Sequence, residues 1–315
     1  MPRVHEITPS RRTLHGHFSA ELEPILSIDS GDTVRFQTLD AGWNLEPRRS
    51  LVHDEHPRRF EPRQPGRDDG HALCGPIAIR GARPGMTLAV GIERVRVGTW
   101  GFTAAGGWAA PLNVRLGVAD EGTYLLWTLD PERLLGRDHH GHVVALRPFM
   151  GVMGMPPPEP GIHSTVPPRF CGGNLDCKEL VAGSVLYLPV PVEGGLFSTG
   201  DGHAAQGDGE VGETAIECPM DEVVLTFTLQ EAPRLTMPRA ETPAGTITFG
   251  FHEDLDEAAH LAIDGMLALM GARYGLSRPQ ALALASVVVD LRVTQICNGV
   301  RGVHAILPPG AIMAP

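Results

Sequence analysis

The chain has 315 residues, of which 42% are hydrophobic and 20% charged, a composition typical of a protein that folds around a packed core. Its 37 acidic residues outnumber the 26 Lys and Arg residues, and the resulting formal charge of −11 repels phosphate backbones and anionic lipid surfaces. We therefore expect neither a nucleic-acid partner nor a membrane partner.

The cysteines and the N-terminus indicate a cellular compartment. The five Cys residues stand at irregular spacings that fit neither a disulfide scaffold nor a zinc motif, so we expect reduced and mostly structural thiols. The N-terminal segment lacks an apolar stretch typical of a signal peptide, and no run of about 18 apolar residues occurs elsewhere. These features predict a cytoplasmic protein.

Short strands separated by turns are the dominant pattern along the chain, which contains 38 Gly and 28 Pro. In the segments 30–34 and 84–88, a Gly turn directly precedes an alternating strand, and similar phrases recur at 182–186 and 244–247. Their uneven spacing argues against a solenoid and favours β-sandwich or jelly-roll-like sheets. Residues 46–69 are rich in Arg and Pro without a clear period, and they predict a long surface loop that is either a lid or a solvated excursion without a role.

Helical periodicity is confined mainly to the C-terminal quarter. Residues 254–274 place Ala258, Ala262 and Met266 on one face, with acidic residues in the first turn. A second helix is predicted to begin after Ser277 as N-cap and to run through Ala285. We therefore predict a mainly β fold whose sheets are covered by C-terminal α-helices. Residues 1–315 form a single unit in this prediction, with a division into 1–150 and 151–315 as the alternative.

The densest polar cluster lies in the Gly-rich segment 198–210. Alternate residues of an extended chain face the same side, so Asp201 and His203 could share a divalent metal ion, with Glu210 as a third ligand or as a base. Asp208 belongs to the same cluster. A calcium-type structural site and a solvated turn remain open as alternatives for this segment.

A second cluster, Cys171-Gly172-Gly173-Asn174-Leu175-Asp176-Cys177, lies upstream. Asn174 and Asp176 alternate and could hydrogen-bond an amide, or they could merely stabilise an Asx-type turn. Cys171 and Cys177 flank this pair, so a thiolate mechanism stays open beside the more common case of a buried apolar thiol.

The order of these motifs resembles the acetamidase/formamidase family. Residues 167–217 contain a Gly-Gly-Asn-x-Asp element, a Leu-Tyr-Leu-Pro-Val strand and a Gly-Asp-x-His-Ala-x-x-Gly-Asp-Gly-Glu segment in the order found in that family. The likeness extends to residues 23–40, 71–90 and 302–305. It implies hydrolysis of formamide, acetamide or a related short amide to a carboxylate and ammonia, and β layers with a helical layer outside. Cys74, Gln37 and the segment 46–69 depart from the pattern, so substrate choice could differ.

We expect the reaction to use water activated by a divalent metal ion, with zinc preferred and calcium as the alternative. The expected roles are metal binding by Asp201, His203 and Glu210, catalysis by Glu210 and Asp208, and substrate binding by Asn174, Asp176 and His71. Three other functions stay open: a non-catalytic β-sandwich that binds a metal or a small ligand, a thiol-dependent amidase, and a jelly-roll iron oxidoreductase. Sheet edges and an apolar helix face favour a homo-oligomer.

The remaining histidines have weaker interpretations. His140 and His142 follow Asp138 and could hold a metal, but their polar surroundings are more typical of an exposed hairpin. His71 enters a pocket or caps a turn, while His163 and His304 are expected to be structural.

Overall fold

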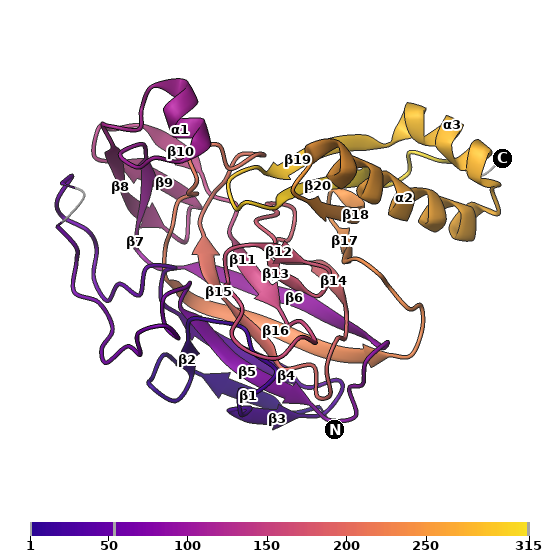
Figure 1. Cartoon of the computed structure of the whole chain (residues 1–315), viewed down its shortest axis with the longest axis horizontal. Helices are drawn as coiled ribbons and strands as arrows, with labels where there is room; N and C mark the ends of the chain where they lie inside the picture. The colour runs from indigo at the N-terminus through magenta and orange to yellow at the C-terminus, as the bar shows by residue number, and fades with distance from the viewer. Residues whose placement is uncertain (1, 53–54, 314–315) are drawn as a thin grey trace.

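The protein is described by a computed structural model that covers residues 2–52 and 55–313. Within these residues the strands form three sheets, and strands account for far more of the chain than helices do (Figure 1). The nine-stranded sheet has the order β1 (Val4–Ile7), β4 (Thr33–Thr38), β16 (Met220–Gln230), β6 (Thr87–Val97), β14 (Ser184–Pro189), β17 (Arg239–Thr242), β18 (Gly245–His252), β20 (Arg301–Leu307) and β19 (Asp290–Gln295).

A seven-stranded sheet packs against it. Its order is β12 (Pro168–Arg169), β13 (Gly172–Asn174), β11 (Phe149–Gly154), β15 (Phe197–His203), β5 (Leu73–Ile79) and β2 (Leu14–His15), with β3 (Leu26–Ile28) paired in parallel to β5. The four-stranded sheet has the order β10 (Val143–Ala145), β9 (Leu135–Asp138), β8 (Thr123–Asp130) and β7 (Trp100–Ala105), and α1 (Pro111–Leu116) connects β7 to β8.

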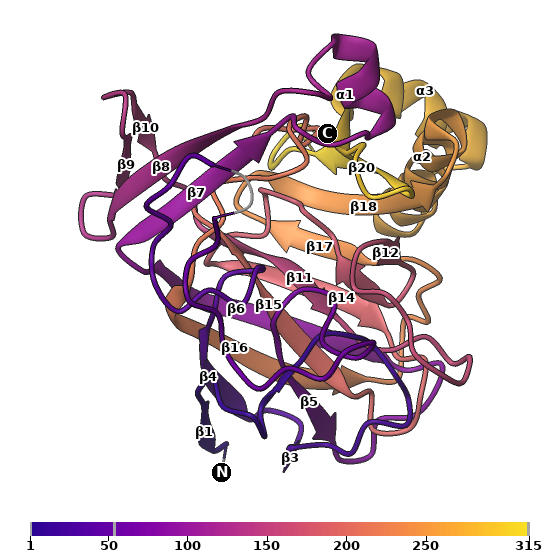
Figure 2. The same ribbon diagram turned by 60° about the vertical axis from the view of Figure 1, so that its left-hand side comes forward.

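The two larger sheets enclose the main core. In β4 the buried side chains alternate with more exposed ones, as expected for a strand with one solvated face, whereas every residue of β15 is buried. Phe197 of β15 and Phe227 of β16 meet edge to face, with ring centroids 5.1 Å apart. This contact joins the two sheets face to face, so the predicted sandwich is confirmed (Figure 2).

The helical layer consists of α2 (Leu255–Tyr274) and α3 (Arg278–Val288), which confirms both predicted helices. The side chain of Asp254 caps α2 by accepting hydrogen bonds from two backbone N–H groups of its first turn. Met266 and Met270 are buried where α2 packs on β18 and β20. A Cβ atom at Gly250 would lie 2.0 Å from the carbonyl oxygen of Ala258, so only glycine allows this close approach between helix and sheet.

Two local features differ from the sequence-based expectation. Asp201 and His203 belong to the end of β15 rather than to the loop, which begins only after His203. The four-stranded sheet and α1 form a lobe that the sequence patterns did not predict. The expected exposed hairpin is found within this lobe: Asp138 ends β9, and the side chain of His142 at the turn is 74% exposed.

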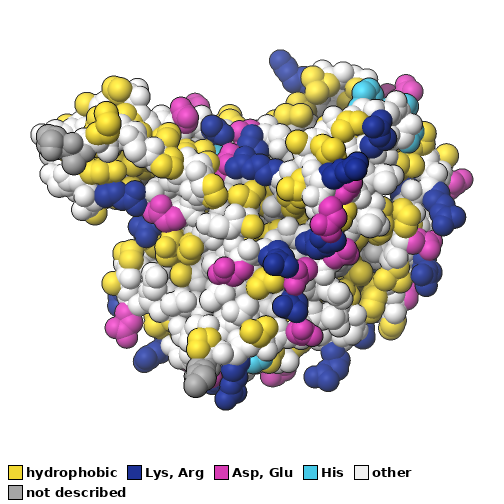
Figure 3. Space-filling view, turned by 180° about the vertical axis from the view of Figure 1, so that it is seen from behind, with side chains coloured by type: hydrophobic (Ala, Val, Ile, Leu, Met, Phe, Trp, Pro, Cys, Tyr) yellow, Lys and Arg dark blue, Asp and Glu magenta, His cyan; other side chains and the backbone are white. Residues whose placement is uncertain are grey.

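Strands from residues 1–150 and from residues 151–315 alternate within the larger sheets, as with β4, β16, β6 and β14. This interleaving is a physical reason to treat the chain as one unit, which stays a prediction. On the face in Figure 3, acidic and basic side chains are intermixed. Among the described residues, the helices are too short or too polar to cross a bilayer.

The Phe197–Phe227 contact predicts a large effect of truncation. Phe227→Ala removes a fully buried ring between the sheets and is expected to lower the free energy of unfolding by about 3–5 kcal/mol. Val287→Ala, at a position that is 80% exposed, should change it by less than about 0.5 kcal/mol. Urea denaturation of both variants measures the difference, and equal effects would contradict this account of the core.

Candidate active site

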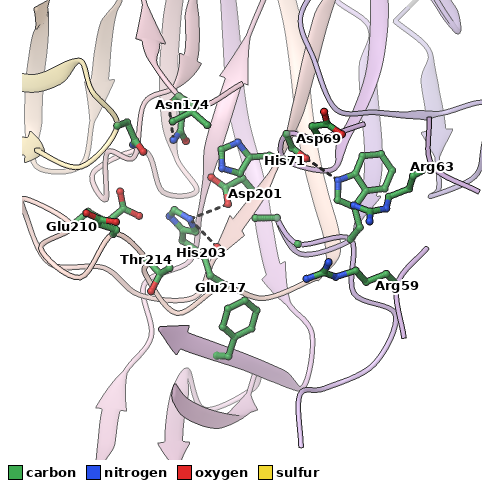
Figure 4. A pocket seen from close by; sticks show the side chains of 18 residues that line it. Arg59, Arg63, Asp69, His71, Asn174, Asp201, His203, Glu210, Thr214 and Glu217 are labelled. Carbon is green, nitrogen blue, oxygen red and sulfur yellow. Dashed lines mark hydrogen bonds and ion pairs between the residues drawn. The ribbon is translucent and has the colours of Figure 1, made fainter. Parts of the chain in front are cut away.

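A cavity of about 370 Å³ contains the polar clusters that the sequence singled out (Figure 4). Its walls come from the end of β15, the loop after it, β7, the segment that precedes β5 and the turn between β19 and β20. The residues that line it are Ala41, Gly42, Trp43, Arg59, Arg63, Asp69, Gly70, His71, Phe102, Val166, Asn174, Asp201, His203, Glu210, Glu213, Thr214, Glu217 and Asn298.

His203 lies at the centre of two groups of potential metal ligands. Its Nε2 atom is 3.2 Å from Asp201 Oδ1 and 3.3 Å from Glu217 Oε2, and these three residues form one group. Asp176, His203 and Glu210 form the other. All five side chains are buried. The described residues therefore include two overlapping sites at which one imidazole and several carboxylates could hold a metal ion.

Unpartnered polar atoms mark the position between the ligands. His203 Nδ1 and Asp176 Oδ1 lie 3.9 Å apart, too far for a hydrogen bond, and within the described part of the chain neither atom has a hydrogen-bond partner. A buried polar atom without a partner costs free energy, and a cation placed between the two would satisfy both. The residues present therefore fit a bound metal ion.

The charges at this site also suit a bound cation. Burial, and then the neighbouring Glu210, raise the pKa of Asp176 well above its usual range. Burial raises the pKa of Glu210 to about 7. Although burial opposes a charged imidazole, the carboxylates of Glu217 and Asp201 raise the pKa of His203 well above its usual value. A divalent cation would allow these carboxylates to be ionised together.

Gly151 of β11 leaves the space that the ligands occupy. Its neighbours pair with Gly202 and Gly200 of β15, so Gly151 lies opposite Asp201. A Cβ atom at this position would lie 2.5 Å from Asp201 Oδ2 and 2.8 Å from both Asp176 Oδ1 and His203 Cε1. The Gly151 carbonyl also accepts a hydrogen bond from the Leu175 backbone N–H at 2.8 Å. One glycine thus holds the 174–176 loop and keeps the ligand space open.

Three of the acidic residues at the site have unusual backbone conformations. Asp176, Asp201 and Glu210 have φ values of 47°, 60° and 45°, a region that L-residues occupy rarely. Such strain persists where the surrounding structure imposes it, and it is concentrated at functional sites. The local fold therefore directs these carboxylates toward His203 at a conformational cost.

The side chains expected to bind substrate lie beside this group. The Nδ2 group of Asn174 donates to the Val166 carbonyl at 3.1 Å, while its buried Oδ1 has no partner among the described residues. The Thr165 hydroxyl lies 2.8 Å from His71 Nδ1 and accepts the His71 backbone N–H at 2.9 Å. If the hydroxyl donates to Nδ1, the Nε2 of His71 is the protonated ring nitrogen.

The turn between β19 and β20 closes the site with two residues that the sequence patterns did not indicate. Asn298 Nδ2 donates to Asp176 Oδ2 at 2.9 Å, and Cys297 Sγ donates to Glu210 Oε2 at 3.1 Å. Glu217 was also missed as a ligand, although it ends the segment that carries the family resemblance and begins a predicted strand. Its position beside His203 could have been suspected; those of Cys297 and Asn298 had no local signal.

The predicted cysteine and aspartate roles have different outcomes. Cys171 and Cys177 are fully buried, and burial raises the pKa of each thiol to about 12, which disfavours a thiolate. Asp208 faces a neighbouring hollow on the surface, where its Oδ2 lies 2.9 Å from Lys178 Nζ. The catalytic role expected for Asp208 stays a prediction, but its carboxylate is engaged with a lysine there.

The other histidines lie in ordinary structural contacts. His163 Nε2 lies 2.8 Å from the Glu159 carbonyl oxygen, and the buried His304 Nδ1 lies 2.7 Å from the Thr294 hydroxyl. His142 Nδ1 lies 2.8 Å from Asp138 Oδ2 in the exposed hairpin. These contacts agree with the structural interpretation of His163 and His304.

The site is a buried cluster of one His and several carboxylates between the sheets of a β-sandwich, and comparison with known proteins identifies the family. The sequence model of the acetamidase/formamidase family matches residues 4–164 and 159–232. The chain belongs to this family, as the resemblance implied.

Individual relatives show the extent of the likeness. The formamidase of Methylophilus methylotrophus is 27% identical over an alignment of 252 positions that covers 63% of this chain and 59% of that protein. The crystal structure of an acetamidase from Bacillus halodurans superposes with a TM-score of 0.83 at 29% identity and covers 97% of each chain. An acetamidase from Yersinia enterocolitica gives a TM-score of 0.84 at 26% identity, covering 98% of this chain and 92% of that one.

The space beside Gly151 makes a specific prediction. Gly151→Ala places a methyl group among three ligand side chains, so its affinity for Zn²⁺ should fall at least about tenfold. Gly207→Ala is the matched control, because a Cβ atom there meets nothing within 4 Å. Calorimetric titration of both variants with Zn²⁺ tests this, and unchanged affinity in Gly151→Ala would place the ion elsewhere.

Proposed function

We propose that this protein hydrolyses a short-chain amide to a carboxylate and ammonia. The observation that carries the proposal is the buried His203 with carboxylates on both sides of its ring, in a cavity of a chain that belongs to the acetamidase/formamidase family. The match spans 59% of the length of the Methylophilus formamidase, so amide hydrolysis is a proposal for this chain. The similarity to acetamidase crystal structures over nearly the whole chain supports the same activity.

The donor set favours zinc among divalent ions. An imidazole nitrogen with a few carboxylates suits Zn²⁺, whereas Ca²⁺ takes six to eight oxygen ligands. In this proposal His203 Nδ1 and Asp176 hold the ion, while Asp201 and Glu217 lie at Nε2 on the other side of the ring and orient it. When bound, the ion would supply a water molecule that ionises near neutral pH.

Glu210 is proposed as the base that accepts the proton of the attacking water. Its buried carboxylate belongs to the same group as His203 and Asp176, so it lies close to a water molecule held at that position. The free Oδ1 of Asn174 can accept a hydrogen bond from the amide NH2 group. His71, with Nδ1 directed to Thr165, can donate from Nε2 to the oxygen of the tetrahedral intermediate.

The cellular location and the oligomeric state are also proposals. A cytoplasmic location fits the free thiols, none of which is paired among the described cysteines. A homo-oligomer would cover apolar side chains of α3 such as Leu282 and Val287, which are 50% and 80% exposed.

Removal of the metal tests the central step. After treatment with a chelator and gel filtration, ammonia release from acetamide and formamide is expected to fall at least about tenfold, because the water loses its activating ion. Added Zn²⁺ should restore the rate more effectively than Ca²⁺. Full activity in metal-free protein would exclude this mechanism.

The same assays separate the alternative functions. If the metal-loaded protein released no ammonia from any short amide, a binding protein would be favoured. Oxygen consumption by an iron-loaded form would indicate an oxidoreductase.

The role of Glu210 can be separated from that of Asp208. Glu210→Gln keeps the shape but removes the proton acceptor, so kcat should fall about a hundredfold or more. Asp208→Asn alters a carboxylate that pairs with Lys178 outside the cavity, and its kcat should stay within about threefold of the wild type. Steady-state ammonia assays with metal content measured in parallel give the answer. A loss in Asp208→Asn as large as in Glu210→Gln would restore the catalytic role expected from the sequence.

A further inference from the structure

Two arginines line the cavity and have no part in the chemistry proposed above. Arg59 and Arg63 come from the segment 46–69, which carries no resemblance to the family pattern. In Figure 4 their side chains reach into the cavity from the side opposite Glu210. The cavity therefore has an acidic end around His203 and a wall that carries two guanidinium groups.

Backbone contacts hold this wall in place. The backbone N–H groups of Leu45 and Phe60 donate to the carbonyls of Arg58 and Trp43 at 2.9 Å and 2.8 Å. The buried Trp43 donates its indole N–H to the Gly70 carbonyl at 2.8 Å. The Arg63 guanidinium carbon lies 6.0 Å from the centre of the Trp43 ring, at the limit of a cation–π contact. The arginines are thus carried by an anchored segment.

Few carboxylates lie close enough to Arg59 and Arg63 to neutralise their positive charges. Arg59 Nη2 lies 3.1 Å from His56 Nδ1, and none of the described carboxylates lies at ion-pair distance from Arg59. Arg63 Nε is 3.8 Å from the exposed Glu61. The Nε atoms of both arginines are buried without a hydrogen-bond partner among the described residues. Burial, and then the charge of Arg63, lower the pKa of Arg59. An anion at this wall would relieve the repulsion between the two guanidinium groups.

The size and charge of the cavity limit what the anion can be. A water molecule takes about 30 Å³ in the liquid, so 370 Å³ is several times the space that the four heavy atoms of acetamide need. Five carboxylates line the same cavity: Asp69, Asp201, Glu210, Glu213 and Glu217. A dianionic phosphate would be repelled more strongly than a singly charged carboxylate, which a guanidinium binds through two parallel hydrogen bonds.

We propose that the substrate is a short amide that carries a carboxylate, with its amide beside His203 and its carboxylate bound by Arg59 and Arg63. This inference rests on the amide hydrolysis proposed above. Water adds its oxygen to the carbonyl carbon, the C–N bond breaks, and the nitrogen leaves as ammonium. The product is therefore a dicarboxylate, and the reaction needs no other reactant.

The test compares charged and neutral amides of matched length. Malonamate, succinamate and glutaramate are each paired with the corresponding neutral diamide, with acetamide alongside. For the wild type, kcat/KM of the best carboxylate amide should exceed that of its diamide at least about tenfold. In Arg59→Gln and Arg63→Gln this ratio should fall to near one, whereas Arg63→Lys should retain part of it. Arg58→Gln is the matched control, because the side chain of Arg58 is 70% exposed and lies 3.7 Å from Glu46.

The outcomes separate this inference from the proposed function. Hydrolysis of acetamide or the diamides without a preference for the charged amides overturns the inference and leaves amide hydrolysis intact. If no amide is hydrolysed, amide hydrolysis is overturned. Calorimetric titration with succinate then tests whether Arg59 and Arg63 bind a carboxylate. Binding of succinate that is lost in Arg59→Gln and kept in Arg58→Gln supports the two arginines as a carboxylate site. Absence of binding overturns it.

Discussion

The site depends on one constraint, which is that a buried imidazole is surrounded by more carboxylates than a protein interior can hold ionised. His203 lies between Asp201 and Glu217 on one side of its ring and Asp176 on the other. The arrangement suits a cation that balances these charges, and Gly151 leaves the space open in which the ligand side chains meet. The site depends on the pairing of β11 with both β13 and β15, because this pairing brings Gly151, Asp176 and Asp201 next to one another.

Local patterns in the sequence predicted the parts of this protein that depend on near neighbours. The second C-terminal helix begins after the predicted cap Ser277, and the first begins one residue later than predicted, with Asp254 as its cap. The alternation in β4 is visible in the chain itself. The two clusters around Asp176 and His203 were also predicted to meet, and the structure brings them together. Their roles in binding and catalysis stay predictions that the variants above address.

The missed features depend on contacts between distant segments. Glu217 reaches the site because its backbone bridges to both His203 and Phe102, which belong to other segments of the chain. Asn298 contacts Asp176 across 122 positions of sequence. The four-stranded sheet escaped prediction for a different reason, since its strands β9 and β10 are short and carry exposed apolar residues such as Leu135 and Val143.

The turn that carries Cys297 and Asn298 has a consequence for how much of the chain forms a working unit. The family match ends at residue 232, yet this turn supplies hydrogen bonds to Asp176 and Glu210. Its strands β19 and β20 belong to the nine-stranded sheet, and α2 covers β20. A protein trimmed to the matched residues would keep Asp201, His203 and Glu217 but lose one wall of their cavity. The part of the chain that builds this cavity is therefore longer than the part that the family model matches.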